Sequence, residues 1–317
     1  MLDALLIIAG PTGTGKTKTA LLLLNRVKAE IISADSRQIY RGMDIGTDKV
    51  SRKIRKKCPH HLIDIADPEE VFAVADFKKL AEAVIKDLQE KNKLPIVVGG
   101  SGLYIKAITS GIFPGPGANW QLRKRLLLKI KKEGLQNVYT ELKRVDPLYA
   151  SKIHPNDKRR LIRALEVYYL TGKPISEHQR ETYPYKGKKL IVGVRWRERS
   201  TLYKVIEDRV DRMIEKGLVE EVKDLLGRGY DEDLPAMQAL GYRQIVAYLK
   251  GKVSFDEAIR LIKRDTCRFA KRQLTWFKKE KDIIWLDRED YPSLKKLAEK
   301  IITILLQEIP QVKEVLK

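Results

Sequence analysis

The residues best suited to chemistry form one octapeptide near the start of the chain, GPTGTGKT at positions 10–17. It matches the G-x-x-x-x-G-K-[ST] pattern of nucleotide-binding and ATP-binding proteins, and it lies between a predicted strand and a predicted helix. The backbone N–H groups of such a loop point at phosphate oxygens, Lys16 adds a positive charge, and Thr17 offers a hydroxyl to Mg²⁺. The candidate phosphate ligands are therefore Gly10, Pro11, Thr12, Gly13, Thr14, Gly15, Lys16 and Thr17. The loop predicts phosphate binding without deciding the reaction.

Two further polar residues follow predicted buried strands. Asp35 ends the segment AEIISAD, and Ser101 follows LPIVVGG. Because parallel sheets bind ligands at the carboxyl ends of their strands, both side chains are expected beside the phosphate loop. Asp35 is a candidate metal ligand, turn cap or base. The acidic residue that usually ends a neighbouring strand in an NTPase is missing after LPIVVGG.

Six short apolar runs supply the strands that would position these residues. ALLIIAG, AEIISAD, HHLIDI and LPIVVGG alternate with helical patterns in the first hundred residues, and LIVGV and IIWLD follow much later. Strand–helix alternation of this kind predicts an α/β fold with a parallel sheet, here a P-loop NTPase-like core.

The segment SGIFPGPGANW, residues 110–120, interrupts this alternation with prolines and glycines and is expected to be a linker. Charge-rich helical sequence follows it. We therefore expect a core domain made of residues 1–113 and 188–317, with a helical insertion domain at 114–187. One long helix is predicted from Thr201 to Leu226, and another from Ser254 to about Lys279, where Ser254 and Glu257 have capping-box spacing.

The net charge is strongly positive, because 63 Lys and Arg residues outnumber 42 Asp and Glu residues by 21. Such an excess favours a polyanionic partner, nucleic acid above all, although a Lys-rich or heat-adapted composition would also produce it. Positive residues concentrate in KRRLIR, residues 158–163, and along one predicted helix where arginines recur every four positions. This stripe consists of Arg260, Arg264, Arg268 and Arg272, and Trp276 continues its spacing. A stripe with so few acids favours an RNA or DNA backbone over a solvated helix face.

Arg209 shares the helical phase of apolar residues, so its charge must be paired with an acid or reach an anionic ligand. Cys58 and Cys267 imply no disulfide framework, and Cys58 with His60 and His61 matches no zinc spacing. No apolar run is long enough to span a bilayer and no signal peptide is evident, so a cytoplasmic protein without a membrane partner is expected.

Together these motifs resemble the bacterial tRNA dimethylallyltransferases, also called tRNA isopentenyltransferases. The resemblance spans most of the chain in the family's order. It rests on GPTGTGKT (10–17), DSRQIYRGMDIGT (35–47), PHHLID (59–64), VVGGSGLYIKA (97–107), RRLIRALEVYYLTGKP (159–174), GYRQI (241–245) and RQLTWF (272–277).

The resemblance implies transfer of a dimethylallyl group from dimethylallyl diphosphate to N6 of the adenosine immediately 3′ of a tRNA anticodon, with Mg²⁺ present. The phosphate loop would then hold a leaving diphosphate. Asp35 would be the general base and Ser101 a nearby hydrogen-bonding group, with Lys16 and Thr17 also in the catalytic set and Arg209 on the diphosphate. Ser101 departs from the threonine common in the family but keeps the hydroxyl.

The resemblance also assigns contacts to the tRNA anticodon stem-loop, and it places the target base out of its stack. The insertion domain would clasp this stem-loop, and the protein would act as a monomer. The residues so assigned, with the arginine stripe added, are Asp35, Ser36, Arg37, Gln38, Ser101, Arg123, Arg159, Arg160, Leu161, Ile162, Arg163, Gln238, Gly241, Tyr242, Arg243, Arg264, Arg268 and Arg272.

Three other functions fit the phosphate loop. An enzyme that prenylates free adenine nucleotides and a nucleoside or nucleotide kinase both need little positive surface beyond the loop. An ATP-gated RNA-binding protein would need the acidic strand end that LPIVVGG lacks.

Overall fold

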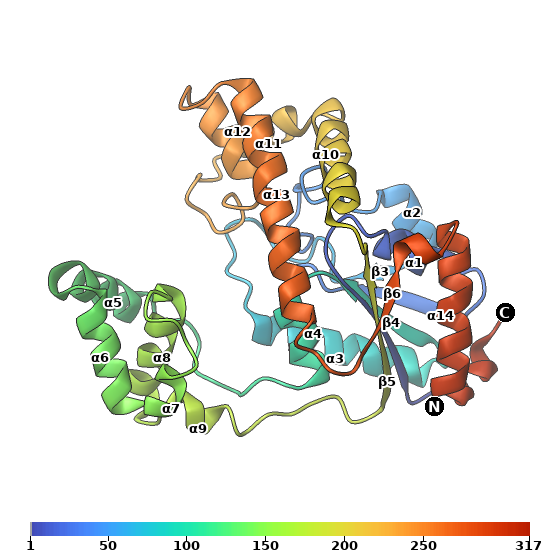
Figure 1. Cartoon of the computed structure of the whole chain (residues 1–317), viewed down its shortest axis with the longest axis horizontal. Helices are drawn as coiled ribbons and strands as arrows, with labels where there is room; N and C mark the ends of the chain where they lie inside the picture. Colours follow the sequence, from blue (N-terminus) through green and yellow to red (C-terminus); the bar gives the residue numbers. More distant parts are fainter. Residues whose placement is uncertain (1) are drawn as a thin grey trace. The chain divides into compact units, whose positions relative to one another are not determined.

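The core of the chain is one six-stranded, fully parallel sheet in the order β3-β2-β4-β1-β5-β6 (Figure 1). The computed structural model describes residues 2–317. The strands are β1 (Ala4–Ala9), β2 (Ala29–Ser33), β3 (His60–His61), β4 (Leu94–Gly99), β5 (Lys188–Arg195) and β6 (Ile283–Asp287). The predicted α/β class with a parallel, P-loop-like sheet is confirmed.

Helices cover both faces of this sheet, as its continuous apolar strands require. On one face α1 (Lys16–Leu23) and α14 (Leu294–Glu308) pack against Leu6 and Ile8 of β1 in a single buried cluster. On the other face lie α3 (Val74–Glu90) and α4 (Gly102–Thr109) (Figure 1). There Phe77 stacks on Tyr104 with ring centroids 4.0 Å apart.

The strand predicted from HHLIDI is much shorter than its apolar pattern suggests. β3 contains only His60 and His61, because Leu62 and Asp64 take positive φ angles of 62° and 57°. Residues other than glycine rarely adopt positive φ angles, and here these angles turn the chain out of the sheet. The loop around it carries α2 (Arg52–Lys57).

A group of helices after β5 forms a second apolar cluster beside the sheet. They are α10 (Arg199–Glu215), α11 (Leu218–Gly227), α12 (Tyr242–Leu249) and α13 (Phe255–Phe277). The single helix predicted from Thr201 to Leu226 is wrong, because Gly217 adopts a left-handed φ of 95° and separates α10 from α11. The start of α13 agrees with its predicted cap, since the Ser254 hydroxyl accepts a hydrogen bond from Glu257 N at 3.2 Å.

Two compact units divide the chain, one made of residues 1–108 and 186–317 and the other of residues 109–185. The second unit begins five residues before the expected limit of 114 and ends two before 187. It contains α5 (Trp120–Glu133), α6 (Leu135–Val145), α7 (Pro147–Ala150), α8 (Lys158–Thr171) and α9 (Ile175–His178). These helices enclose a separate apolar core. The remaining short elements are the 3₁₀ helices η1 (Arg288–Asp290) and η2 (Pro310–Val315).

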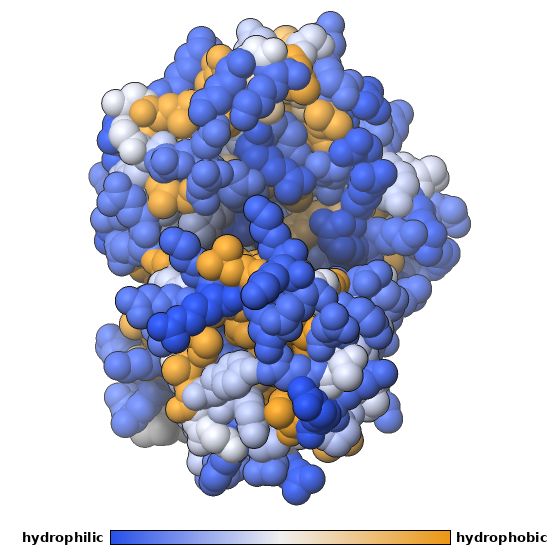
Figure 2. Space-filling model, turned by 90° about the vertical axis from the view of Figure 1, so that its left-hand side faces the viewer, coloured by the Kyte–Doolittle hydropathy of each residue, from blue (hydrophilic) through white to orange (hydrophobic). Residues whose placement is uncertain are grey.

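Hydrophilic residues cover most of the face seen in Figure 2, with small apolar patches between them. None of the helices within residues 2–317 combines the length and the apolar content that a bilayer crossing requires.

Candidate active site

Three neighbouring strands end where the candidate residues begin. β4 lies between β1 and β2, so Gly10 after β1, Ser101 after β4 and Asp35 after β2 leave the same edge of the sheet. The registers agree, since Ala9 is level with Gly99 and Ser33 with Val98. The parallel topology therefore assembles the phosphate loop with both predicted partners.

The phosphate loop takes a path that its first glycine makes possible. Gly10 has a φ of 137°, and a Cβ at this position would lie 2.2 Å from the carbonyl oxygen of Val194. No other residue fits against β5 in this conformation. Inside the loop the Thr14 hydroxyl donates a hydrogen bond to the Pro11 carbonyl oxygen at 3.1 Å.

Lys16 is buried in the loop, with 9% of its surface exposed. Burial first, and the nearby Arg209 charge second, lower the pKa of its amine to about 7, while the Asp35 carboxylate opposes the shift. Arg209 and Asp35 are therefore close enough to Lys16 to affect the pKa of its amine. A phosphate group entering the loop would restore the charged amine.

Three side chains from later parts of the chain contact the loop. The Arg209 guanidinium on α10 donates to the Thr12 hydroxyl, and its Nε lies 3.4 Å from Asp48. Arg209 therefore has an acidic partner and also lies at the phosphate loop, while its contact with an anionic ligand stays a prediction. The indole of Trp196, just after β5, donates to the Gly13 carbonyl oxygen at 3.0 Å.

The third of these side chains is Gln273 of α13. Its Oε1 accepts a hydrogen bond from Thr12 N at 2.9 Å, and its Nε2 donates one to the Gly100 carbonyl oxygen at 2.8 Å. Sequence reasoning missed Gln273 and Trp196. A signal for Gln273 exists, because this polar residue shares the buried face of α13 with Ala270 and Phe277.

Thr17 lies in the first turn of α1 with a hydroxyl that makes no hydrogen bond within the described residues, so it is open to a metal ion or a ligand. Across residues 2–317 no three His, Cys, Asp or Glu side chains gather as metal ligands. His61 instead pairs with Glu30 at 2.7 Å.

The Asp35 carboxylate and the Ser101 hydroxyl organise the turn after β2. Oδ1 of Asp35 accepts a hydrogen bond from Arg37 N at 2.8 Å. Oγ of Ser101 accepts one from Ser36 N at 3.0 Å. Asp35 is thus a turn cap through one oxygen, while its other oxygen has no hydrogen-bond partner among residues 2–317.

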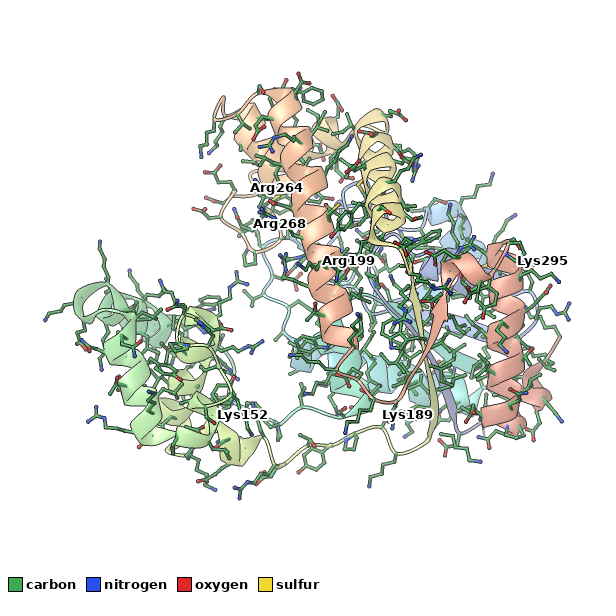
Figure 3. All side chains as sticks on the ribbon, in the orientation of Figure 1. Lys152, Lys189, Arg199, Arg264, Arg268 and Lys295 are labelled. Carbon is green, nitrogen blue, oxygen red and sulfur yellow. The ribbon has the colours of Figure 1, made fainter. Side chains whose placement is uncertain are left out.

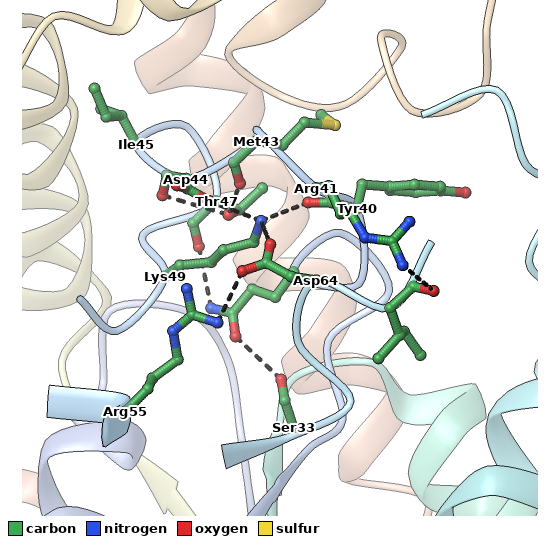
Figure 4. A network of polar contacts seen from close by, with 12 residues as sticks. Ser33, Tyr40, Arg41, Met43, Asp44, Ile45, Thr47, Lys49, Arg55 and Asp64 are labelled. Atoms are coloured by element: carbon green, nitrogen blue, oxygen red, sulfur yellow. Dashed lines mark hydrogen bonds and ion pairs between the residues drawn. The ribbon is translucent and has the colours of Figure 1, made fainter. Parts of the chain in front are cut away.

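The Gln38 amide bonds to Ser33 and Thr47. Figure 4 labels both of these residues within a wider polar network. Oε1 of Gln38 accepts from the Ser33 hydroxyl at 3.0 Å, and its Nε2 donates to the Thr47 carbonyl oxygen at 3.2 Å. Beside it the side chain of Lys49 is only 1% exposed, and its ammonium lies 2.6 Å from Asp64 and 2.9 Å from Asp44. This network links Gln38 and Lys49 to Ser33, Asp44 and Asp64.

Glu221 of α11 also contacts the loop of residues 38–49. Its carboxylate accepts hydrogen bonds from the backbone N–H groups of Asp44, Ile45 and Gly46 and from the hydroxyl of Tyr242. Tyr242 is fully buried, and Gly46 beside it has no room for a side chain, since a Cβ there would lie 2.5 Å from the Tyr242 ring. The Tyr242 side chain therefore has a structural role, and a tRNA contact at residue 242 stays a prediction.

The other predicted contacts around α12 divide by exposure. Gly241 is buried, whereas Gln238 and Arg243 are exposed. Arg243 pairs with Asp265 at 2.8 Å, and Gln238 donates to the Glu232 carbonyl oxygen at 2.8 Å. Of these three residues, only Gln238 and Arg243 face solvent.

The arginine stripe on α13 is exposed but partly neutralised. Arg264 and Arg268 project from the helix (Figure 3), 2.9 Å and 3.8 Å from the Asp265 carboxylate. Arg260 pairs with Glu257, and Arg272 lies over the Phe269 ring. Trp276 is only half-exposed, and its ring packs closely on Gly102, where a Cβ would lie 2.3 Å away.

Within residues 109–185, two of the predicted arginines serve a buried acid. Glu166 is fully buried, and its carboxylate accepts hydrogen bonds from Arg123 at 2.8 Å and Arg163 at 2.7 Å. Burial opposes ionisation of Glu166, but these arginines outweigh it and lower the pKa of its carboxyl. Both guanidinium groups therefore stabilise the fold of this unit by neutralising a buried carboxylate.

Four other predicted contacts lie on α8. The side chains of Leu161 and Ile162 are buried in the apolar core of this unit, and a tRNA contact at these two residues stays a prediction. Arg159 and Arg160 are exposed, and Arg160 lies 3.3 Å from Asp157.

A parallel sheet whose first strand leads through GPTGTGKT into a helix defines a P-loop-type α/β protein with a candidate phosphate site at the carboxyl edge of the sheet. Residues 38–280 match the family described as IPP transferase, and the chain belongs to this family.

Curated relatives extend the match over nearly the whole chain. A tRNA dimethylallyltransferase of Geobacter metallireducens is 48% identical over 89% of this chain and 92% of its own length. A protein of the same name from Pelotomaculum thermopropionicum is 47% identical over 94% and 95% of the two chains.

Two solved structures are similar in fold. The tRNA isopentenylpyrophosphate transferase of Bacillus halodurans has a TM-score of 0.73 and 40% identity, with 99% of each chain covered. A eukaryotic dimethylallyltransferase acting on tRNA has a TM-score of 0.79 and 29% identity, covering 95% of this chain and 78% of its own. The resemblance inferred from the motifs is confirmed.

Proposed function

We propose that this protein transfers a dimethylallyl group from dimethylallyl diphosphate to N6 of the adenosine immediately 3′ of the anticodon in tRNA, releasing diphosphate. The names of its relatives support prenyl transfer to tRNA over the kinase, free-nucleotide and ATP-gated alternatives. The observation that carries the proposal is the placement of Asp35 and Ser101 beside a phosphate loop that contains Lys16.

The phosphate loop would stabilise the leaving group. Cleavage of the allylic C–O bond builds negative charge on the diphosphate. The loop N–H groups other than Thr12 N, together with Lys16 and Arg209, would balance this charge as it develops. The loop would thus act on a discarded diphosphate, and no phosphoryl group is transferred.

Asp35 would accept the proton that the adenine amine loses. Its Oδ1 is held by Arg37 N, which fixes the orientation of the carboxylate while the second oxygen stays free for the amine. Ser101 and Gln38 border the same turn, and their hydrogen bonds hold it for the extruded base.

Mg²⁺ fits the hydroxyl of Thr17, which has no other partner in the described chain and stands at the site of the metal-binding threonine in phosphate loops. When bound, the ion would supply positive charge to the diphosphate. The exposed arginines Arg268 and Arg272 of α13 would meet the RNA backbone.

Incubation with labelled dimethylallyl diphosphate and Mg²⁺ tests the proposal. Unmodified tRNA should become labelled, whereas AMP should not. Label on AMP but never on tRNA would favour the free-nucleotide activity and contradict the proposal.

A further inference from the structure

One buried amide joins the two ends of the proposed site. Gln273 touches the phosphate loop through Oε1, which accepts from Thr12 N, and touches the β4–α4 turn through Nε2, which donates to the Gly100 carbonyl oxygen. Its side chain comes from α13, more than 170 residues further along the chain than either partner. Both polar atoms of the amide are therefore used, and the residue is 7% exposed.

The site is built around this amide. A Cβ at Gly100 would lie 2.3 Å from Nε2 of Gln273, so any side chain at Gly100 would displace the amide. Because Nε2 is a donor and Oε1 an acceptor, glutamine matches one backbone N–H and one backbone carbonyl at once. A buried carboxylate or an apolar side chain would leave at least one of these backbone groups unpaired.

The contacts continue from Gly100 to the proposed base. Ser101 follows Gly100 directly, and its hydroxyl accepts from Ser36 N, next to Asp35. If the Gly100 carbonyl moves, Ser101 and the turn that carries Asp35 are therefore expected to move with it. A displacement of Thr12 reaches the hydroxyl that Arg209 contacts.

We propose that Gln273 is a positioning residue that sets the spacing between the diphosphate cradle and the Asp35–Ser101 turn. The inference rests on the proposed function, because it assigns the diphosphate to the loop. Gln273 acts through Thr12 and Gly100.

The chain offers a matched control in Gln244 of α12. It is 5% exposed, its Oε1 accepts from Gly241 N at 3.0 Å, and its Nε2 donates to Asp265 at 3.0 Å. Gln273→Leu and Gln244→Leu thus each remove one accepted and one donated hydrogen bond from a buried glutamine. Only the first touches the phosphate loop.

The experiment measures the dissociation constant of pyrophosphate with Mg²⁺ by calorimetry, together with the thermal midpoint, for the full-length wild type and both variants. We expect both variants to lose thermal stability, but only Gln273→Leu to bind pyrophosphate at least about tenfold more weakly. Equal pyrophosphate affinities for the two variants would overturn the inference. A wild type that bound no pyrophosphate would instead overturn the proposed function.

A second variant, Gln273→Glu, tests whether the side chain must both accept from Thr12 N and donate to the Gly100 carbonyl. It remains informative even if Gln273→Leu does not fold. In Gln273→Glu the ionised carboxylate accepts from Thr12 N but cannot donate to Gly100, whereas the neutral acid can do both. The affinity of Gln273→Glu relative to wild type should therefore rise at least about threefold from pH 8 to pH 5.5. The ratio cancels the titration of free pyrophosphate, which is the same in both experiments. A ratio that stayed constant across this range would overturn the inference.

Discussion

The ammonium nitrogen of Lys16 donates a hydrogen bond to the Pro11 carbonyl oxygen at 2.5 Å, within the same phosphate loop. In the described chain Lys16 has no acidic hydrogen-bond partner, and burial holds its pKa near 7. An anionic ligand in the loop would supply the missing negative charge.

This relationship predicts proton uptake when pyrophosphate binds. Between about pH 7 and 10 most of the free protein carries neutral Lys16, and the bound anion raises the pKa of the amine, so binding should consume up to about one proton. Calorimetry at about pH 8 in two buffers of different ionisation enthalpy measures this number. Lys16→Arg, which stays charged throughout, should take up fewer protons. Equal uptake by the two proteins would contradict the prediction.

The same pKa predicts how Lys16 affects folding. The pKa is lower in the folded chain, so the unfolded chain binds more protons between pH 7 and the ordinary value of 10.5. The contribution of Lys16 to the free energy of unfolding should therefore rise with pH across this window. Lys16→Met should be more stable than wild type at about pH 7, with a difference that shrinks towards about pH 10. Denaturant unfolding at several pH values measures it, and a difference that widened with pH would contradict the sign.

Asp35→Asn should distinguish the role of Asp35 as a turn cap from its proposed role as the general base. Asparagine still accepts the hydrogen bond from Arg37 N, so the turn should survive, but it cannot take a proton from the amine. We expect turnover to fall by a factor of about 10² or more, with tRNA affinity within a few-fold of wild type. Single-turnover kinetics and filter binding measure the two quantities. Wild-type turnover in Asp35→Asn would exclude Asp35 as the base.

Arg268 and Arg272 provide the cleaner test of the α13 surface. Arg264 lies 2.9 Å from Asp265, so replacing it would remove a close ion pair, whereas Arg268 lies 3.8 Å from the same carboxylate. Changing Arg268 and Arg272 together to glutamine should weaken tRNA binding and reduce the slope of log K against log salt by about 1.5. Lys295→Gln on α14 is the control, since it removes an exposed charge from another helix (Figure 3). A slope equal to that of wild type would assign these arginines to solvent alone.

Glu166→Gln should destabilise residues 109–185. It leaves two guanidinium groups without their shared carboxylate, and because both arginines are partly exposed we expect a loss of about 2 kcal/mol, below the usual cost for a fully buried pair. The pKa of Glu166 is lowered in the folded state, so this stabilisation is present above the ordinary value of 4.5 and is lost as the pH falls below it. Hydrogen exchange of this segment at about pH 7 and thermal unfolding from about pH 7 to 3 test both points. Glu133→Gln, on an exposed carboxylate of the same unit, should have little effect.

Local sequence was sufficient for the elements with strong signals. GPTGTGKT identified the phosphate loop, the apolar runs predicted all six strands, and Asp35 and Ser101 were placed at strand ends because parallel strands share one carboxyl edge. The predicted helix from Thr201 is broken at Gly217, and the strand predicted from HHLIDI ends before Leu62. Both residues have left-handed φ angles, which end a helix or strand although the spacing of apolar residues continues past them.

The partners of individual side chains depended on contacts between distant parts of the chain. Arginine spacing indicated a basic face, but only the fold shows that Arg123 and Arg163 neutralise a buried Glu166 and that Tyr242 is enclosed by Glu221 and Gly46. The sequence alone determined the phosphate loop, the sheet and the family, because these rest on short motifs and on periodicity. The tertiary structure decided which polar residues serve the site and which serve the fold, because a hydrogen bond such as that from Thr12 to Gln273 joins residues that no local pattern connects.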